Sequence, residues 1–337
     1  MDKHTGKQIK SKLLDAKHIL IVAHKNPDGD AIGSSLALYH FLKILKCKVS
    51  VVMPNDYPSF LKWLPGNEAV LIYENQTDVC DEMINSADVI FTLDFNAFHR
   101  TGFMEESLAN SEALKIMIDH HLSPEDYATY TYSDSSMSST CEMVYHFIEA
   151  LGDLDNINKD IATCLYLGIM TDTGSFKFPL TTHITHAIIA KLIEKGVDKT
   201  EIHNAVYDNN TFSRLQLLGC ALSNLKMIQS YKTAYITLSQ EELNTYQFKK
   251  GDTEGFVNYA LSLKGIVLAA IFIENKKEDI IKISFRSKGN FSVNALSQSH
   301  FNGGGHANAA GGKSDLSLDD TVKKFVDILP QYNTLLA

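Results

Sequence analysis

The sequence has few cysteines and no long apolar stretch. Its five cysteines are scattered and form no C-x-x-C pair. An odd number of cysteines without such a pair is typical of buried thiols in a protein from a reducing compartment. No apolar run approaches the length needed to span a membrane. Residues 1–17 are charged and lack the apolar core of a signal peptide. We therefore expect a cytoplasmic protein with no membrane association.

The sequence also lacks an excess of positive charge. Lysine and arginine number 31 against 40 aspartates and glutamates, a formal net charge of −9. A protein that coats long duplex nucleic acid needs a basic field and many phosphate contacts, so that class is not expected. A small anionic substrate held by metal ions remains compatible with this charge. The length of 337 residues and the ordinary globular composition favour two domains.

The stretch that organises the first half lies between a strand and a helix. Residues 18–23 are short, apolar and rich in β-branched side chains, which predicts a buried parallel strand. Apolar residues at helical spacing over 31–46 predict a helix. His24, Asp28 and Asp30 then lie on the turn at the carboxyl end of the strand, where open α/β sheets bind ligands. The alternative is a turn in which a carboxylate caps the helix and His24 is incidental.

Further candidate ligands follow other predicted elements. The predicted strand 88–94 ends on Asp94, the predicted strand 115–121 ends on Asp119, His120 and His121, and Asp172 follows an apolar segment predicted to be helical. A parallel sheet brings the carboxyl ends of its strands together, so these side chains could share one cleft.

The donor set itself favours one class of metal. Aspartates are common at the start of loops, and one such ending would mean little, but their joint occurrence favours a metal site. Several aspartates with two histidines are too acidic for a structural zinc site. They suit two Mn²⁺ or Mg²⁺ ions about 3.5–4 Å apart that share one carboxylate.

The second half has a different composition. Predicted strands at 233–238, 265–274 and 279–286, and helices at 293–300 and 318–329, indicate a smaller α/β domain with some antiparallel pairing. A terminal phosphate is the kind of group that the guanidinium of Arg286 could bind, with Ser287 beside it. Gly303, Gly304 and Gly305 allow backbone amides to approach an anion, and the donor His306 follows them. The alternatives are a flexible glycine turn and a solvated polar turn.

The ordered motifs resemble one known family. His24-x-x-Pro27-Asp28-Gly29-Asp30, then Asp94, Asp119-His120-His121 and Thr171-Asp172-Thr173-Gly174 resemble the four motifs of the DHH phosphoesterase superfamily. The segment 303–312 resembles the signature of the DHH-associated C-terminal domain. Each motif alone is modest, whereas the ordered set covers most of the chain. The closest resemblance is to the NrnA-type branch, described as bifunctional oligoribonucleases and phosphoadenosine-phosphate phosphatases that use Mn²⁺.

The resemblance implies an architecture and a division of the chain. The expected fold is α/β, with an N-terminal, doubly wound, mostly parallel sheet and a smaller C-terminal α/β domain, and with the active site in the cleft between them. We expect a catalytic metal-binding domain over residues 1–198, a helical linker over 199–229 and a substrate-binding domain over 230–337. The boundary between the two halves is expected near residue 210.

The resemblance also implies roles for individual residues. A first metal ion would be held by His24, Asp28 and Asp94, and a second by Asp30, Asp94, His120 and Asp172. Asp94 would bridge the ions together with the attacking water. His121 would face the substrate phosphate, and Asp119 would orient the histidines. In the second domain the substrate would be bound by Arg286, Ser287, Gly303, Gly304, Gly305 and His306.

These roles predict a metal-dependent phosphodiesterase and phosphatase. It would hydrolyse short oligoribonucleotides to mononucleotides, and phosphoadenosine phosphate to AMP, by activating a water between two Mn²⁺ ions, with Mg²⁺ as the other candidate. The alternatives are a phosphodiesterase for linear or cyclic dinucleotides, an inorganic pyrophosphatase, and a non-catalytic nucleotide-binding regulator. Every motif acid is present, which argues against the regulator. Expected partners are short RNA and small phosphonucleotides, and a homodimer is the favoured assembly.

Overall fold

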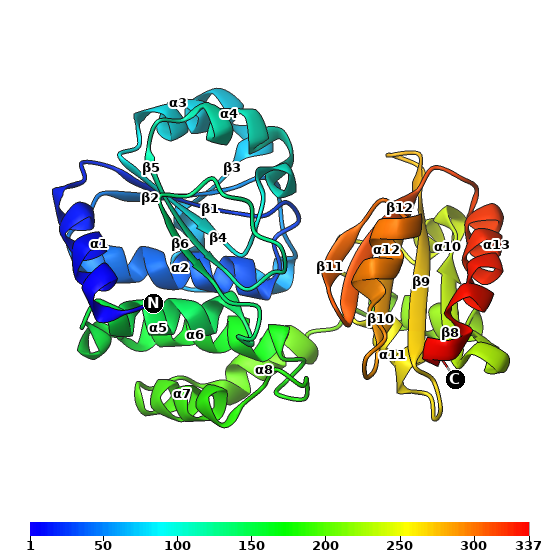
Figure 1. Cartoon of the computed structure of the whole chain (residues 1–337). Coiled ribbons are helices and arrows are strands. Elements are labelled where there is room, and N and C mark those ends of the chain that lie inside the picture. The colour runs from blue at the N-terminus through cyan, green and yellow to red at the C-terminus, as the bar shows by residue number, and fades with distance from the viewer. Residues whose placement is uncertain (337) are drawn as a thin grey trace. The chain divides into compact units, whose positions relative to one another are not determined.

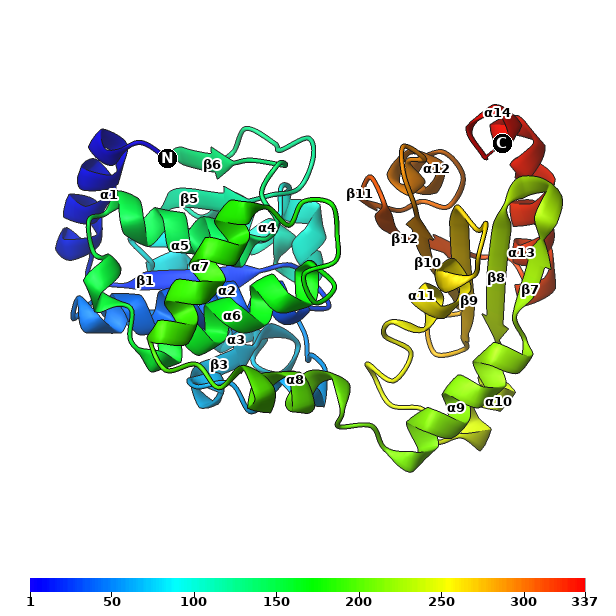
Figure 2. The same ribbon diagram turned by 90° about the horizontal axis from the view of Figure 1, so that it is seen from below.

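The computed structural model of this chain describes residues 1–336 and contains two compact units, Met1–Asn209 and Asn210–Ala337. Figures 1 and 2 show a sheet with helices in each unit. The expected linker, residues 199–229, contributes a helix to each unit: α8 (Lys199–Tyr207) belongs to the first and α9 (Phe212–Ser223) to the second.

The first unit is built on a six-stranded sheet in which all neighbouring strands run parallel. The strand order is β3-β2-β1-β4-β5-β6. The central strands β1 and β4 are buried along their whole length, as expected where helices cover both faces of a sheet. The predicted parallel sheet is confirmed. The strands are β1 (Ile19–Ala23), β2 (Val49–Met53), β3 (Val70–Ile72), β4 (Val89–Leu93), β5 (Leu114–Asp119) and β6 (Tyr130–Ser133).

Helices cover both faces of this sheet, so the first unit is doubly wound. In Figure 1, α2, α5 and α6 lie on one side and α3 and α4 on the other. The α-helices are α1 (Lys3–Asp15), α2 (Gly29–Ile44), α3 (Thr77–Ser86), α4 (Glu105–Asn110), α5 (Thr140–Ala150), α6 (Lys159–Asp172), α7 (His183–Glu194) and α8, and the short 3₁₀ segments are η1 (Ser59–Leu61), η2 (Asn67–Ala69), η3 (Tyr73–Asn75), η4 (Phe98–Met104) and η5 (Leu154–Asn156).

Helix α2, which follows the first motif, is buried along most of its length. It packs against α6 at glycines: a Cβ atom on Gly33 of α2 would lie 2.7 Å from the backbone oxygen of Cys164 on α6, and a Cβ on Gly168 of α6 would lie 2.9 Å from Oδ1 of Asp30 on α2. A methyl group at either position would force the helices apart. These contacts fix the start of α2, and with it Asp28 and Asp30, against the end of α6, which carries Asp172.

The second unit has a six-stranded sheet in the order β11-β12-β10-β9-β8-β7. Only β8 and β9 pair in parallel; the other neighbours are antiparallel. The expected smaller α/β domain with antiparallel pairing is confirmed. Its strands are β7 (Lys226–Ile228), β8 (Thr233–Leu238), β9 (Leu268–Asn275), β10 (Ile280–Ser287), β11 (Gly304–His306) and β12 (Ala309–Ser314).

Helices pack on both faces of this second sheet and form two apolar cores. One core gathers Phe272, Phe285 and Phe325, and the other gathers Leu217, Ile236 and further apolar side chains. The helical segments are α9, η6 (Gln229–Tyr231), α10 (Gln240–Thr245), α11 (Phe256–Ser262), α12 (Val293–His300), α13 (Leu318–Ile328), η7 (Leu329–Tyr332) and α14 (Asn333–Leu336). Among residues 1–336, no helix combines the length and the apolar character needed to cross a membrane.

Candidate metal centre

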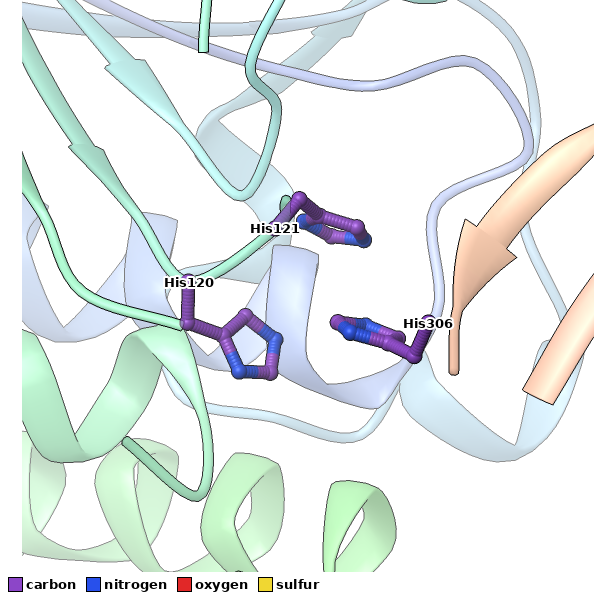
Figure 3. Close-up of side chains that lie close together, drawn as sticks. All are labelled: His120, His121 and His306. Carbon is purple, nitrogen blue, oxygen red and sulfur yellow. The ribbon is translucent and has the colours of Figure 1, made fainter. Parts of the chain in front are cut away.

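The candidate ligands of the first unit lie at the carboxyl ends of three neighbouring strands, β1, β4 and β5. His24 directly follows β1, Asp94 directly follows β4, and Asp119 is the last residue of β5. His120 and His121 come next in the chain, and Figure 3 shows their rings side by side after β5. Their ring centroids are 5.1 Å apart in an edge-on arrangement. Parallel pairing therefore brings together side chains that are far apart in sequence.

One group of donors consists of His24, Asp28 and Asp94, whose ligand atoms all lie within 4.8 Å of one another. The Nε2 atom of His24 is 3.2 Å from Oδ2 of Asp94 and 3.9 Å from Oδ1 of Asp28. Asp28 is also the N-cap of α2, because its Oδ1 accepts hydrogen bonds from the amides of Asp30 and Ala31. The capping role and the position in the donor group therefore coexist in one side chain.

A second group of donors consists of Asp30, His120 and Asp172, again within 4.8 Å of one another. The Nε2 atom of His120 is 3.4 Å from Oδ2 of Asp172 and 3.8 Å from Oδ2 of Asp30. The same atom is 3.6 Å from Oδ1 of Asp94. The two oxygens of Asp94 thus face different groups: Oδ2 faces His24 and Oδ1 faces His120.

Asp94 has an unusual backbone conformation. Its φ angle is +63°, a left-handed region that costs an L-residue about 1–2 kcal/mol. Its amide donates to the carbonyl of Ile118 on β5 (3.1 Å), and the hydroxyl of Thr140 donates to Oδ1 of its side chain (3.0 Å). Such strain persists where the surroundings over-determine a residue, which is common at functional sites. Here it places a carboxylate that is 2% exposed between the two donor groups.

Asp30 is held by the first amides of helix α5. The amide of Thr140 donates to Oδ2 (2.6 Å) and that of Cys141 donates to Oδ1 (2.8 Å). The first amides of a helix have no partner within the helix and favour a negative charge. Thr140 therefore contacts both Asp30 and Asp94. The sequence did not single out this role, because it depends on where α5 begins relative to a residue 110 positions earlier.

Each histidine is oriented through its Nδ1 atom. Nδ1 of His24 bonds the carbonyl of Lys25 (2.9 Å), and Nδ1 of His120 bonds the carbonyl of Met137 (3.2 Å). A carbonyl only accepts, so in the neutral ring Nδ1 carries the proton and Nε2 keeps its lone pair for a metal.

Asp119 acts on the second of the paired histidines. Its Oδ1 bonds Nδ1 of His121 (2.7 Å) and its Oδ2 accepts from the amide of His121 (3.0 Å). The predicted orienting role of Asp119 therefore corresponds to His121, whereas the carbonyl of Met137 serves His120. Sequence patterns cannot reveal the Met137 contact because it uses a backbone atom.

The electrostatics of the cluster indicate a shortage of positive charge. Burial, together with the charges of Asp94 and Asp172, raises the pKa of Asp30 well above its ordinary value. Burial and the charge of Asp94 raise the pKa of Asp119 to about 6. Burial opposes the protonation of His120, but the charges of Asp172, Asp94 and Asp30 outweigh it and raise its pKa to about 9. Divalent cations would relieve this repulsion among buried acids.

The pKa values of two other side chains in the cluster are lowered. Burial, followed by the positive charge of Arg100, holds the pKa of His121 well below its ordinary value. Burial alone would raise the pKa of Asp94, but the hydrogen bond from His24 and the charge of His121 hold it below the ordinary value. The hydrogen bond and the neighbouring charges thus favour the ionised form of Asp94, in contrast to Asp30 and Asp119, whose pKa values are raised.

The donor chemistry fits Mn²⁺ or Mg²⁺. The two groups offer carboxylate oxygens and imidazole nitrogens, which suit hard or borderline divalent ions. The nearest thiol, that of Cys141, stays protonated because burial and the charge of Asp30 raise its pKa well above the usual value. A thiolate site of the structural zinc type is therefore not formed here.

In the second unit, the structure brings Arg286 and His306 to one face of the sheet. Arg286 on β10 lies directly opposite Ala309 on β12, and His306 on β11 lies opposite the same Ala309. Directly paired residues point to the same face of a sheet, and two strand spacings amount to roughly 10 Å. The small side chain of Ala309 separates these two cationic or polar side chains.

The other predicted contacts of the second unit already have partners there. The hydroxyl of Ser287 donates to the carbonyl of Phe291 (2.5 Å), and the amide of Gly305 donates to Oδ1 of Asn294 (2.9 Å). The amide of Gly303 approaches the carbonyl of Ser297 (3.4 Å), and a Cβ there would overlap the backbone of β12. Close packing thus explains glycine at 303, and the expected anion nest loses two of its three amides.

Comparison with known proteins identifies the family. Residues 18–169 match the family described as "DHH family, N-terminal domain", and residues 230–333 match the DHHA1 domain. The bifunctional oligoribonuclease and PAP phosphatase NrnA of Thermus thermophilus is 30% identical over 310 residues, which cover 92% of this chain and 88% of that protein. This chain belongs to the DHH family.

Two further relatives extend the comparison of this DHH-family chain. The crystal structure of an exopolyphosphatase-related protein from Bacteroides fragilis superposes with a TM-score of 0.94 at 43% identity, covering 99% of this chain and 98% of that one. The cyclic-di-AMP phosphodiesterase GdpP of Bacillus subtilis is 25% identical over 342 residues, which cover 96% of this chain and 49% of GdpP. The DHH and DHHA1 parts thus occur together in this chain and in longer relatives.

Proposed function

We propose that this chain is a Mn²⁺-dependent phosphodiesterase and phosphatase that releases mononucleotides from short oligoribonucleotides and converts phosphoadenosine phosphate to AMP. The observation that carries the proposal is the placement of Asp94, whose two carboxylate oxygens face two separate donor groups. The similarity to NrnA of T. thermophilus, 30% identical along most of both chains, supports the substrate class.

In this proposal His24, Asp28 and Asp94 would hold one ion, and Asp30, His120 and Asp172, together with Asp94, would hold the other. When bound, such a pair lowers the pKa of a water and neutralises the charge of a phosphoryl group. Mg²⁺ is the alternative ion, since the same ligand types suit both.

The protein's own groups keep these ligands in place before a substrate arrives. Thr140 and the amides of α5 fix Asp94 and Asp30, and the carbonyls of Lys25 and Met137 turn the Nε2 atoms of two histidines toward the carboxylates. Ligands that need no rearrangement cost no reorganisation during the reaction. Preorganisation is therefore the main contribution of the chain itself.

His121 is the proposed contact to the substrate phosphate. Asp119 bonds the Nδ1 atom and the amide of His121, and these two contacts fix the orientation of the ring. The ring held in this orientation would face a phosphate oxygen of the substrate. Asp119 would then act by positioning, as carboxylates beside histidines do in metal sites.

Arg286 and His306 are the proposed contacts of the second unit to the terminal phosphate of the substrate. They share one face of the sheet, across Ala309, and a guanidinium can bind a phosphate through two parallel hydrogen bonds. The net charge of −9 agrees with short substrates, because long polymers need many lysine and arginine contacts.

A second candidate function is hydrolysis of a linear or cyclic dinucleotide. A cyclic-di-AMP phosphodiesterase is 25% identical to this chain over 96% of the chain's length. This similarity favours dinucleotide hydrolysis over pyrophosphate hydrolysis as the second candidate. The two candidates share the metal centre and differ in the substrate that reaches it.

The test is an assay with Mn²⁺ and four substrates side by side: RNA of five nucleotides, phosphoadenosine phosphate, cyclic di-AMP and pyrophosphate. We expect mononucleotides from the RNA and AMP from phosphoadenosine phosphate. Preference for cyclic di-AMP would establish the second candidate instead. Pyrophosphate as the sole good substrate would overturn both.

Arg286→Ala tests the role of the second unit in the same assay. We expect KM for the RNA to rise roughly 10-fold or more while kcat changes little, because anchoring in the ground state is lost first and hydrogen bonds to charged groups contribute about 1.5–3 kcal/mol. The matched control is Lys282→Ala, four residues earlier on β10, where the lysine pairs with Glu278 at the surface. Unchanged kinetics for Arg286→Ala would refute the phosphate contact.

A further inference from the structure

The segment η4, Phe98–Met104, adjoins the metal centre from the side of β1. It begins four residues after Asp94, and the carbonyl of Arg100 accepts a hydrogen bond from the amide of Lys25 (2.7 Å). Lys25 directly follows the candidate ligand His24. The segment is therefore fastened by its backbone to the turn that carries the first metal motif, and it has no part in holding the metals.

Arg100 places an uncommitted cation beside this cluster. Its backbone is bonded to Lys25, next to His24, and its positive charge acts to lower the pKa values of His24, Asp119 and His121. Within residues 1–336 the guanidinium makes no ion pair or hydrogen bond. A guanidinium offers five donors in a planar fork that matches phosphate. Its donors are available for an anion.

Phe103 is an exposed aromatic ring held in place by a neighbouring side chain. Its exposure is 76%, and Nζ of Lys25 lies 5.4 Å from its ring centroid. Gly102 turns the chain between Arg100 and Phe103 with a φ of +64°, and the stem of Lys25 packs against that turn: a Cβ on Gly102 would lie 3.0 Å from Cδ of Lys25. A cation over one part of a ring stabilises its placement.

We propose that η4 is a nucleotide-binding surface of the first unit, in which Arg100 contacts a phosphate of the substrate and Phe103 stacks on a nucleobase. The proposal rests on the proposed function and narrows its substrates to those that carry a base next to the scissile phosphate. Stacking on aromatic side chains is tolerant of sequence, which suits an enzyme for short RNA of any composition. Pyrophosphate would use Arg100 alone.

The experiment compares two substrates and two pairs of variants in the presence of Mn²⁺. The substrates are a 5′-phosphorylated diadenylate and the same dinucleotide with one base removed. The variants are Phe103→Ala with its conservative partner Phe103→Tyr, and Arg100→Gln with its partner Arg100→Lys. Phe212→Ala is the matched control, because Phe212 is equally exposed (75%) but lies on α9 in the second unit.

For Phe103→Ala we expect KM for the diadenylate to rise about 10-fold, within the range that base stacking supports, with kcat nearly unchanged. Phe103→Tyr restores the KM, and the abasic substrate shows no difference between Phe103→Ala and the unmodified protein. Arg100→Gln raises KM for both substrates, and Arg100→Lys recovers part of it. Phe212→Ala changes neither value. Mn²⁺ binding, measured by calorimetry, stays the same in all variants.

Two results would distinguish a failure of the η4 proposal from a failure of the proposed function. If the unmodified protein hydrolyses the diadenylate but Phe103→Ala and Arg100→Gln leave KM unchanged, η4 is not a substrate surface and the proposed function stands. If the unmodified protein hydrolyses neither substrate, the proposed function falls and this surface falls with it. Because Phe103 is exposed, its replacement keeps the proposal testable even if an Arg100 variant fails to fold.

Discussion

At the scale of single residues, Asp94 concentrates the properties expected of a bridging ligand. It is buried, its backbone is in the left-handed region, and its oxygens face two groups of donors. We expect Asp94→Asn to keep the local structure, because asparagine tolerates this conformation. Mn²⁺ affinity should fall more than about 100-fold, because mutating residues that only hydrogen-bond to the metal ligands already lowers metal affinity by ~10–100-fold. Calorimetric titration and the turnover of short RNA check both effects.

Asp88→Asn is the matched control for this substitution. Asp88 immediately precedes the other end of β4 and accepts hydrogen bonds from the amides of Lys17 and His18, at the surface and away from the donor groups. Its replacement should leave Mn²⁺ affinity unchanged. Equal Mn²⁺ binding by Asp94→Asn and the unmodified protein would contradict the bridging role.

At the scale of elements, the packing of α6 against its neighbours positions the ligands. A methyl group on Gly168 would overlap the sulfur of Cys141 and lie 2.9 Å from Oδ1 of Asp30. We expect Gly168→Ala to lower the free energy of unfolding by about 1–3 kcal/mol, the usual cost of overpacking, and to weaken Mn²⁺ binding by displacing Asp30. Denaturant unfolding and calorimetry measure the two effects.

Gly219 provides the comparison for the Gly168 substitution. It lies inside α9, and a Cβ there would meet no atom within 4 Å. Gly219→Ala should therefore stabilise the protein by ~0.5–1 kcal/mol through helix propensity. If both substitutions changed the free energy of unfolding in the same direction, close packing at Gly168 would not explain the effect of Gly168→Ala.

The start of α10 gives a prediction about pH. Glu242 closes a capping box with Ser239 and also accepts from Nδ2 of Asn224 (2.7 Å). Burial alone would raise the pKa of Glu242, but the hydrogen bonds from Asn224 and from the amide and hydroxyl of Ser239 hold it below its ordinary value of 4.5. Because the pKa of Glu242 is lower in the folded than in the unfolded protein, its ionised carboxylate stabilises the fold above pH 4.5. This stabilisation is lost as the pH falls from 4.5 through the pKa of the folded state.

Glu242→Gln should therefore cost about 1 kcal/mol of unfolding free energy at pH 7, the typical value of a helix cap, and progressively less below pH 4.5. Urea unfolding at a series of pH values, with Glu241→Gln on the same turn as the control, measures this difference. A cost that stays constant down to pH 3 would show that the carboxylate charge is not involved.

At the scale of the whole molecule, metal binding should stabilise the first unit. Ions that bind the folded state at 100 times their Kd contribute about 2.7 kcal/mol, which is roughly 5–10 °C in Tm for a unit of this size. The sole tryptophan, Trp63, belongs to the first unit, so its fluorescence reports the unfolding of that unit. Mg²⁺ or Mn²⁺ should raise this transition and a chelator should lower it again.

In Asp94→Asn the same ions should leave the Trp63 transition unchanged. That comparison distinguishes binding at the proposed centre from weak binding of cations to an acidic surface. A shift of equal size in Asp94→Asn would place the ions elsewhere in the protein.

Much of the fold was predictable because its signals are local. The predicted strands at residues 18–23 and 88–94 correspond to β1 and β4, whose apolar runs are buried from end to end. The edge strand β3 was not predicted, since it is short and half-buried and has no comparable apolar run.

The site was predictable where ligands follow strands and unpredictable where backbone atoms act. His24, Asp94 and His120 stand beside strong strand signals. Thr140 and the carbonyl of Met137 do not, because their roles depend on the position of α5 and of a loop in space. Arg100 also went unnoticed, as an isolated arginine in a polar segment carries no local signal.

The amino-acid sequence by itself determined the strongly apolar strands of the first unit, their parallel arrangement, and the acids and histidines at their carboxyl ends, because period and composition act over neighbouring residues. Only the tertiary structure decided that Asp94 turns one oxygen toward His24 and the other toward His120. That outcome depends on a strained backbone angle and on hydrogen bonds from β5 and α5, and contacts between distant segments exist only once the chain has folded.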